Sequence, residues 1–203
     1  MCFQLDDDAS NGYEAIAPAY IAGRGTRPTI GDPVGAATVR AWAETLPAGA
    51  TVLDLGCGPG EPITRILRDA GLTVYAVDAS PTMVATFRER FPDAQIECNS
   101  VEASDFFGRK FDGVIAWGLL FLLEPAAQAH VISKVARAIE PGGHFVFTSL
   151  KQRHAWLDAK TQRPSQSLGA EEYERLLGDA GMLLVGEAED AGDNHYYFAR
   201  KGP

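Results

Sequence analysis

The stretch VLDLGCGPGEP, residues 52–62, joins a short apolar run to a turn that contains three glycines. The apolar run predicts a buried strand over residues 51–55, and the segment after the turn, residues 61–71, predicts a helix. Glycine has no Cβ, so it accepts positive φ angles and lets a ligand approach the backbone closely. The N–H groups at the start of the helix would then face that ligand. The stretch therefore predicts a ligand-binding loop between a strand and a helix.

The same alternation of strands and helices continues along the chain. Further strands are expected at 73–78, 94–99, 112–117 and 143–149, and further helices at 80–91 and 125–143. Such repetition predicts parallel strands joined by right-handed crossovers, in an α/β sheet covered by helices on both faces. Near the end of the chain, a helix at 169–180 precedes strands at 182–189 and 195–200, and the tight turn between those strands predicts an antiparallel hairpin.

These elements fit one domain, because 203 residues are enough for one sizeable core. We expect four parts within the domain. They are N-terminal cap helices (1–46), a cofactor-binding core (47–150), a substrate-side insertion (151–168), and a C-terminal helix with the hairpin (169–203).

Composition and charge restrict the class of protein. The chain carries a net charge of −9, which disfavours a nucleic acid as substrate because binding a phosphate backbone needs a basic surface. No apolar run is long enough to span a membrane, and the first residues do not resemble an export signal. The cysteines Cys2, Cys57 and Cys98 match neither a disulfide framework nor a metal site. We therefore expect a cytoplasmic protein that contacts neither a membrane nor a nucleic acid and holds no metal.

The second strand of the expected unit ends in a carboxylate. Asp78 follows Gly56 by 22 residues, where an acid can accept hydrogen bonds from the hydroxyls of a ribose. A dinucleotide-binding loop has the pattern G-x-G-x-x-G, whereas this loop has G-x-G-x-G. Glu61 stands in the place of the third dinucleotide glycine, where its charge would oppose a pyrophosphate. The pattern thus favours an adenosine-containing cofactor other than NAD(P), and an NAD(P)-linked oxidoreductase stays an alternative.

Four segments in order resemble the motifs of class I S-adenosylmethionine-dependent methyltransferases that act on small molecules. They are VLDLGCGPG, VYAVDAS, FDGVIAWGLLFLL and IEPGGHFVFTS, and the likeness covers roughly residues 10–200. The resemblance implies a Rossmann-like, doubly wound sheet of seven strands in the order 3-2-1-4-5-7-6, with strand 7 antiparallel. It also implies S-adenosyl-L-methionine as cofactor, S-adenosyl-L-homocysteine as product, and methyl transfer to a small-molecule acceptor by in-line displacement.

The resemblance also assigns roles to individual residues. The methionine part of the cofactor would lie on a loop of Gly56, Cys57, Gly58 and Gly60 beside Asp54, and the ribose on Asp78. Adenine would contact Ala79, Met83, Ser100, Val101 and Glu102, while Trp117 and Gly118 would flank the ribose and sulfonium. Tyr13, Tyr20 and Arg24 would close over the cofactor carboxylate. Relatives often carry an acid where Ser100 stands, so adenine recognition is expected to differ here.

The acceptor side offers fewer indications. The apolar segment LLFLL, residues 119–123, predicts no general base, so alignment and desolvation should carry most of the catalysis. For a hydroxyl acceptor, His154 and Tyr13 are the candidate bases. Arg153 and His154 are candidate substrate contacts in a segment where Lys151, Lys160 and other cations would draw in an anionic substrate. Because no base is obvious, a non-catalytic cofactor-binding sensor or accessory subunit stays an alternative.

Overall fold

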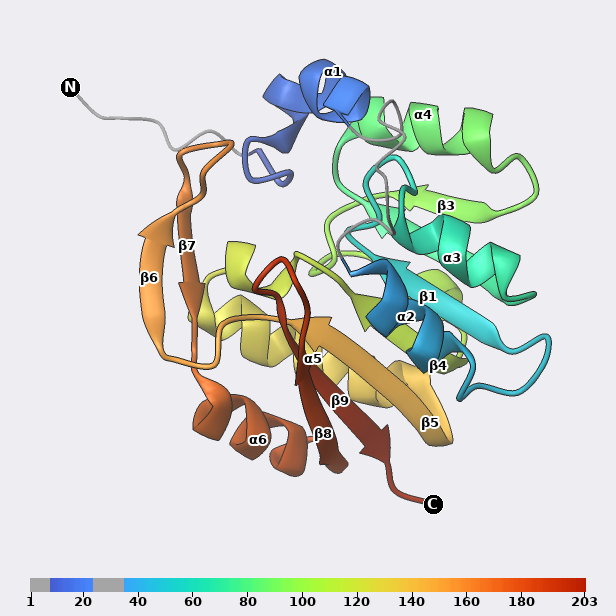
Figure 1. The fold of residues 1–203 in the computed structure, drawn as a ribbon, viewed down its shortest axis with the longest axis vertical. Helices are drawn as coiled ribbons and strands as arrows, with labels where there is room; N and C mark the ends of the chain where they lie inside the picture. The colour runs from blue at the N-terminus through green and yellow to red at the C-terminus, as the bar shows by residue number, and fades with distance from the viewer. Residues whose placement is uncertain (1–7, 24–34) are drawn as a thin grey trace.

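The computed structural model describes residues 8–23 and 35–203, and its centre is one seven-stranded sheet (Figure 1). The strands are β1 (Thr51–Leu55), β2 (Thr73–Asp78), β3 (Gln95–Cys98), β4 (Phe111–Ala116), β5 (Ile139–Thr148), β8 (Met182–Glu189) and β9 (His195–Lys201). Their order is β3-β2-β1-β4-β5-β9-β8. All neighbouring pairs are parallel except those that involve β9, which is antiparallel to both β5 and β8. The predicted order is confirmed, with β8 and β9 as its sixth and seventh strands.

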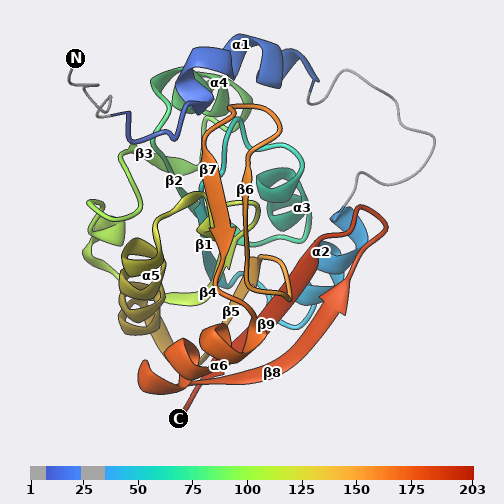
Figure 2. The same ribbon diagram turned by 90° about the vertical axis from the view of Figure 1, so that its left-hand side faces the viewer.

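Helices cover both faces of this sheet (Figure 2). They are α1 (Tyr13–Gly23), α2 (Ala36–Ala43), α3 (Ile63–Asp69), α4 (Pro81–Arg90), α5 (Pro125–Ala138) and α6 (Ala170–Asp179), with short 3-10 turns η1 (Phe106–Gly108) and η2 (Leu120–Leu122). On β1, Leu53 packs into the core formed with α5 and α6, while its neighbour Val52 packs into the core formed with α2 and α3. This alternation follows from the pleat of the strand. Among the described residues, no helix combines the length and apolar character needed to cross a bilayer.

The boundary between α5 and β5 differs from the expected one. The sequence predicts a helix until the Pro-Gly-Gly turn at 141–143, but α5 ends at Ala138 and β5 begins at Ile139. The Ile139 side chain is fully buried in the core, and its backbone pairs with Phe111 at the start of β4. Tertiary packing therefore overrides the helical pattern over the last residues of that segment.

The segment 151–168 forms a second sheet that the sequence did not indicate. Its strands, β6 (His154–Leu157) and β7 (Pro164–Ser167), make an antiparallel hairpin that rises beside the main sheet toward α1 (Figures 1 and 2). At its tip, Asp158 Oδ2 accepts a hydrogen bond from the Tyr13 hydroxyl at 3.4 Å. Arg163 lies 3.7 Å from Asp8, just before α1. The hairpin thus supports one side of the N-terminal helix.

The other side of α1 is fixed to α4 through one carboxylate. Glu14 accepts hydrogen bonds from the Ser80 hydroxyl, from the Thr82 backbone N–H at 3.1 Å and from the Thr82 hydroxyl at 2.6 Å. These bonds, first among them the one from Ser80, lower the pKa of Glu14. The position also suits a negative charge because it is the N-terminus of α4. Helix α1 is therefore held like a roof between α4 and the β6–β7 hairpin.

Candidate cofactor and acceptor site

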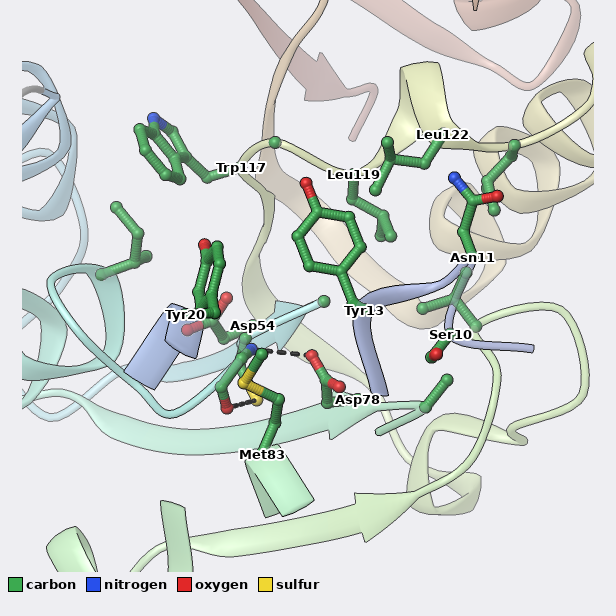
Figure 3. A pocket seen from close by; sticks show the side chains of 18 of the residues that line it. Ser10, Asn11, Tyr13, Tyr20, Asp54, Asp78, Met83, Trp117, Leu119 and Leu122 are labelled. Atoms are coloured by element: carbon green, nitrogen blue, oxygen red, sulfur yellow. Dashed lines mark hydrogen bonds between the residues drawn. The ribbon is translucent and has the colours of Figure 1, made fainter. Parts of the chain in front are cut away.

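A cavity of about 270 Å³ lies beneath this roof, at the carboxyl ends of β1, β2 and β4 (Figure 3). In an open α/β sheet, ligands bind at this edge, where the chain order reverses between β1 and β4. Most residues that the sequence assigned to a cofactor lie in its wall. They are Tyr13, Tyr20, Asp54, Gly56, Cys57, Gly58, Asp78, Ala79, Met83, Val101, Glu102, Trp117 and Gly118.

The structure does not bring every sequence candidate to the cavity. Arg153 and His154 are exposed at the start of β6 and are absent from the described lining, so the geometry favours neither as a substrate contact nor as a base. Ser100 also lies outside the lining, and its hydroxyl accepts the Ala103 backbone N–H at 3.1 Å. Arg24 lies outside the described residues.

The three loop glycines meet different demands. Gly58 has a φ of +54°, and a Cβ built there would face Tyr20 Cε1 at 3.9 Å, on the cavity side of the loop. A Cβ on Gly56 would come within 2.9 Å of Leu119. A Cβ on Gly60 would lie 2.3 Å from the Phe91 ring, and Gly60 is not part of the described lining. Only Gly58 therefore leaves open space for a ligand, whereas Gly60 is required for packing against α4.

Two carboxylates form the floor of the cavity. Asp54, whose exposed fraction is 1%, accepts a hydrogen bond from the Thr64 hydroxyl at 2.6 Å. Asp78 accepts the backbone N–H groups of Gly58 at 2.7 Å and Ser80 at 2.9 Å. Burial raises the pKa of Asp54 to about 7, and the nearby Asp78 adds to that shift. Burial also raises the pKa of Asp78. These acids would gain most from a ligand that brings positive charge and hydroxyl donors.

The raised pKa of Asp54 predicts a pH-dependent stability. The folded state keeps a proton on Asp54 up to a pH of about 7, while the unfolded state loses it near 3.8, so the Asp54 contribution to stability falls as pH rises between these values. Asp54→Asn keeps the acceptor for Thr64 without the charge. We expect its free energy of unfolding, relative to the wild type, to rise from pH 4 to pH 7 by roughly 4 kcal/mol at most. Urea unfolding of the unliganded proteins measures this, and a pH-independent difference would contradict it.

The wall opposite the acids is apolar and aromatic. Leu119, Phe121, Leu122 and Leu123 line the cavity after β4, so the apolar segment noted in the sequence is part of the site. Beside them, the indole Nε1 of Trp117 donates to the Tyr196 hydroxyl at 2.9 Å, and that hydroxyl donates to Asp190 at 2.8 Å. Trp117 is therefore both a lining residue and a hydrogen-bonded part of the structure, rather than only one of the two.

The sequence gave no indication of several polar lining residues. Asn194 reaches the cavity because the β8–β9 hairpin turns back beside Trp117, and Ser10 and Asn11 reach it because they precede α1. Of the cations noted in the segment 151–168, Lys160 alone lines the described cavity, whereas Lys151 pairs with Glu187 at 3.3 Å. The remaining unforeseen lining residues are Ala9, Glu61 and Ile63.

Nucleophilic chemistry by the protein itself finds no support here. The Cys57 thiol lies in the loop, but burial raises its pKa well above the ordinary value, and the charges of Asp78 and Asp54 act in the same direction. The thiol thus stays protonated and poorly nucleophilic. Within the part of the chain that the structure describes, no cluster of side chains could hold a metal ion. The arrangement is better suited to holding and orienting two reactants.

Comparison with known families and proteins gives consistent results. Residues 52–143 match the model of a methyltransferase domain family. An uncharacterized methyltransferase of Synechocystis is 35% identical over 109 residues, which are 54% of this chain and 51% of that protein. A malonyl-[acyl-carrier protein] O-methyltransferase of Salmonella typhimurium is 32% identical over 129 residues, or 61% of this chain and 50% of that protein. The chain thus spans about half the length of these two relatives.

Similarity in structure extends over the whole chain. A 1,6-didemethyltoxoflavin-N1-methyltransferase of Burkholderia thailandensis, solved with 1,6-didemethyltoxoflavin and S-adenosylhomocysteine, has a TM-score of 0.71. The match covers 100% of this chain and 94% of that one, at 22% sequence identity. At this identity the likeness concerns the fold, and it places the glycine loop and the cap elements within one known architecture.

Proposed function

Because the chain belongs to the class I S-adenosylmethionine-dependent methyltransferases, we propose that it transfers a methyl group from S-adenosylmethionine to a small-molecule acceptor. The observation that carries the proposal is the cavity with Asp54 and Asp78 in its floor beside the open side of Gly58. Two buried acids with raised pKa values suit a ligand that carries an ammonium group, a sulfonium and ribose hydroxyls. The loop, the acids and the apolar wall therefore fit this cofactor.

Each part of the cofactor has a matching part of the wall. Asp54 would hold the amino group, and Asp78 would accept the ribose hydroxyls with the lone pairs that Gly58 and Ser80 leave free. Met83, which is almost fully buried, and Leu119 would contact the base. When bound, the cofactor supplies an electrophilic methyl group on a sulfonium.

The protein would contribute alignment and exclusion of water. The apolar wall after β4 and the roof formed by α1 limit water near the reacting atoms, which strengthens the effect of the fixed acids. Of the two candidate bases, Tyr13 lines the cavity, and its hydroxyl donates to Asp158 at 3.4 Å. Tyr13 is therefore the residue we assign to receive a proton when the acceptor has one to lose.

The acceptor is proposed to be a small molecule that enters between the roof and the β6–β7 hairpin. The N-terminal part (1–46) and the insertion (151–168) would form its walls, and the core (47–150) would hold the cofactor. Lys160 from the hairpin and Asn194 from the β8–β9 turn supply polar contacts on that side. The relative that acts on 1,6-didemethyltoxoflavin shows that this architecture accommodates a small heterocycle in another protein.

Binding and turnover test the proposal separately. Calorimetry should show a 1:1 complex with S-adenosylhomocysteine and no complex with NAD(P)H. Methyl transfer from isotopically labelled S-adenosylmethionine would then be measured over a broad panel of small metabolites. Absence of any binding at millimolar S-adenosylmethionine and S-adenosylhomocysteine would contradict the proposal, while binding without turnover on any acceptor would favour a sensor or accessory subunit.

A further inference from the structure

One polar group in the cavity wall has no partner. The side-chain nitrogen of Asn11, Nδ2, is buried and makes no hydrogen bond with any described residue. The other asparagine in the same wall, Asn194, donates twice to Asp190, at 3.0 and 2.9 Å. A buried donor without an acceptor is costly, so native structures rarely keep one without a use. Asn11 therefore differs from Asn194 in a way that points to a ligand.

The position of Asn11 is held in place before any ligand arrives. Its φ of 51° lies in the left-handed region, which asparagine tolerates better than most residues. The Asp8 carbonyl accepts the Asn11 backbone N–H at 3.1 Å, and the Asp8 carboxylate accepts the backbone N–H groups of Ser10 and Gly12. The side chain thus extends from a turn that is fixed on both sides, which lowers the cost of ordering it in a complex.

The sheet order indicates which part of the cofactor would meet Asn11. Asp54 ends β1 and Asp78 ends β2, and β3 lies on the far side of β2 from β1. A ligand with its amino group at Asp54 and its ribose at Asp78 must continue toward the β3 side. Figure 3 shows Asn11 on that side of Asp78, next to Leu122 and away from Tyr20 and Trp117. The base of the cofactor would therefore lie beside Asn11.

The residue expected to recognise the base is already engaged. The Ser100 hydroxyl accepts the Ala103 N–H at 3.1 Å and does not reach the described lining. The Ser10 hydroxyl donates to Asp8 and accepts the Glu14 N–H at 2.9 Å. A carboxamide, in contrast, offers a donor and an acceptor side by side, which match a ring nitrogen and the 6-amino group of adenine.

On the basis of the proposed function, we propose that Asn11 recognises the adenine of S-adenosylmethionine. Its Nδ2 donates to a ring nitrogen and its Oδ1 accepts from the 6-amino group. Recognition of the base thus comes from the N-terminal cap, in place of a side chain at Ser100. Asn11 is a specificity residue for the cofactor and takes no part in the transfer of the methyl group.

Replacement by glycine tests this assignment, because glycine keeps the left-handed backbone at no steric cost and removes only the amide. Calorimetry would compare S-adenosylhomocysteine with its purine analogue, in which hydrogen replaces the 6-amino group. The wild type should prefer the adenine compound by about 10-fold or more, and Asn11→Gly should lose most of that preference. The control Asn194→Ala should keep it, because Asn194 is on the other side of the cavity.

The outcomes separate the two proposals. If the wild type binds S-adenosylhomocysteine and Asn11→Gly keeps the full preference for adenine, the role of Asn11 is overturned and the proposed function stands. If the wild type binds neither compound, the proposed function fails and the role of Asn11 falls with it. A loss of preference in Asn11→Gly but not in Asn194→Ala supports both.

Discussion

Replacing Gly58 with valine is expected to weaken the binding of S-adenosylhomocysteine by about 100-fold or more. Gly58 has a φ of +54°, a conformation that a β-branched residue rarely adopts, and a Cβ there would point toward Tyr20 at the edge of the cavity. Valine would therefore fill the space left for the ligand and displace the N–H that donates to Asp78 at 2.7 Å. Calorimetry on the purified variant measures the effect.

Gly49→Val is the matched control for backbone strain. Gly49 has a φ of +75°, lies just before β1, and has no neighbouring atom within 4 Å of a built Cβ. Both variants should lose stability by about 1–2 kcal/mol because of the left-handed backbone. Only Gly58→Val should lose the ligand, and normal binding by that variant would show that the loop is not the binding site.

Asp78→Asn is expected to weaken S-adenosylhomocysteine binding by about 50-fold. The change removes the charge that strengthens hydrogen bonds from the ribose hydroxyls. It also turns an amide NH₂ toward one of the two backbone N–H groups, of Gly58 and Ser80, that Asp78 now accepts. Calorimetry measures the binding, and the free energy of unfolding should fall as well, by about 1–2 kcal/mol.

Asp112→Asn provides the control for the structural part of that change. Asp112 Oδ2 accepts the Thr51 backbone N–H at 2.8 Å and the Thr51 hydroxyl at 3.0 Å, at the end of β1 opposite to the cavity. This variant should lose similar stability and bind the ligand like the wild type. Equal loss of affinity in both variants would mean that Asp78 acts through folding alone.

The sequence was sufficient for the sheet because its local patterns and its packing agree. Strands 51–55 and 73–78 are bounded by turn residues, apolar within, and observed at those limits. The acids Asp54 and Asp78 could be placed for the same reason, since strand ends determine where they point. The helix before residue 143 was predicted too long because burial of Ile139 is a long-range effect that no local pattern records.

The roof of the site could not be predicted in the same way. Asn11, Lys160 and Asn194 lie in turns, and they meet only because three separate turns converge on one cavity. No periodicity encodes that convergence, since it depends on how α1 and two hairpins pack. His154 shows the opposite error, because its position after β5 was correctly judged but the unpredicted strand β6 leaves it exposed.

The fastening of α1 has a consequence for how the chain is made. Its partners are distant in sequence: Ser80 follows Glu14 by 66 residues, and Asp158 follows Tyr13 by 145. At ordinary rates of ribosomal synthesis, the second partner appears roughly 10 s or more after the helix has been made. The N-terminal helix therefore emerges first and docks last. A nascent chain that stops before residue 158 would already carry the loop and both acids, yet hold its roof from one side only.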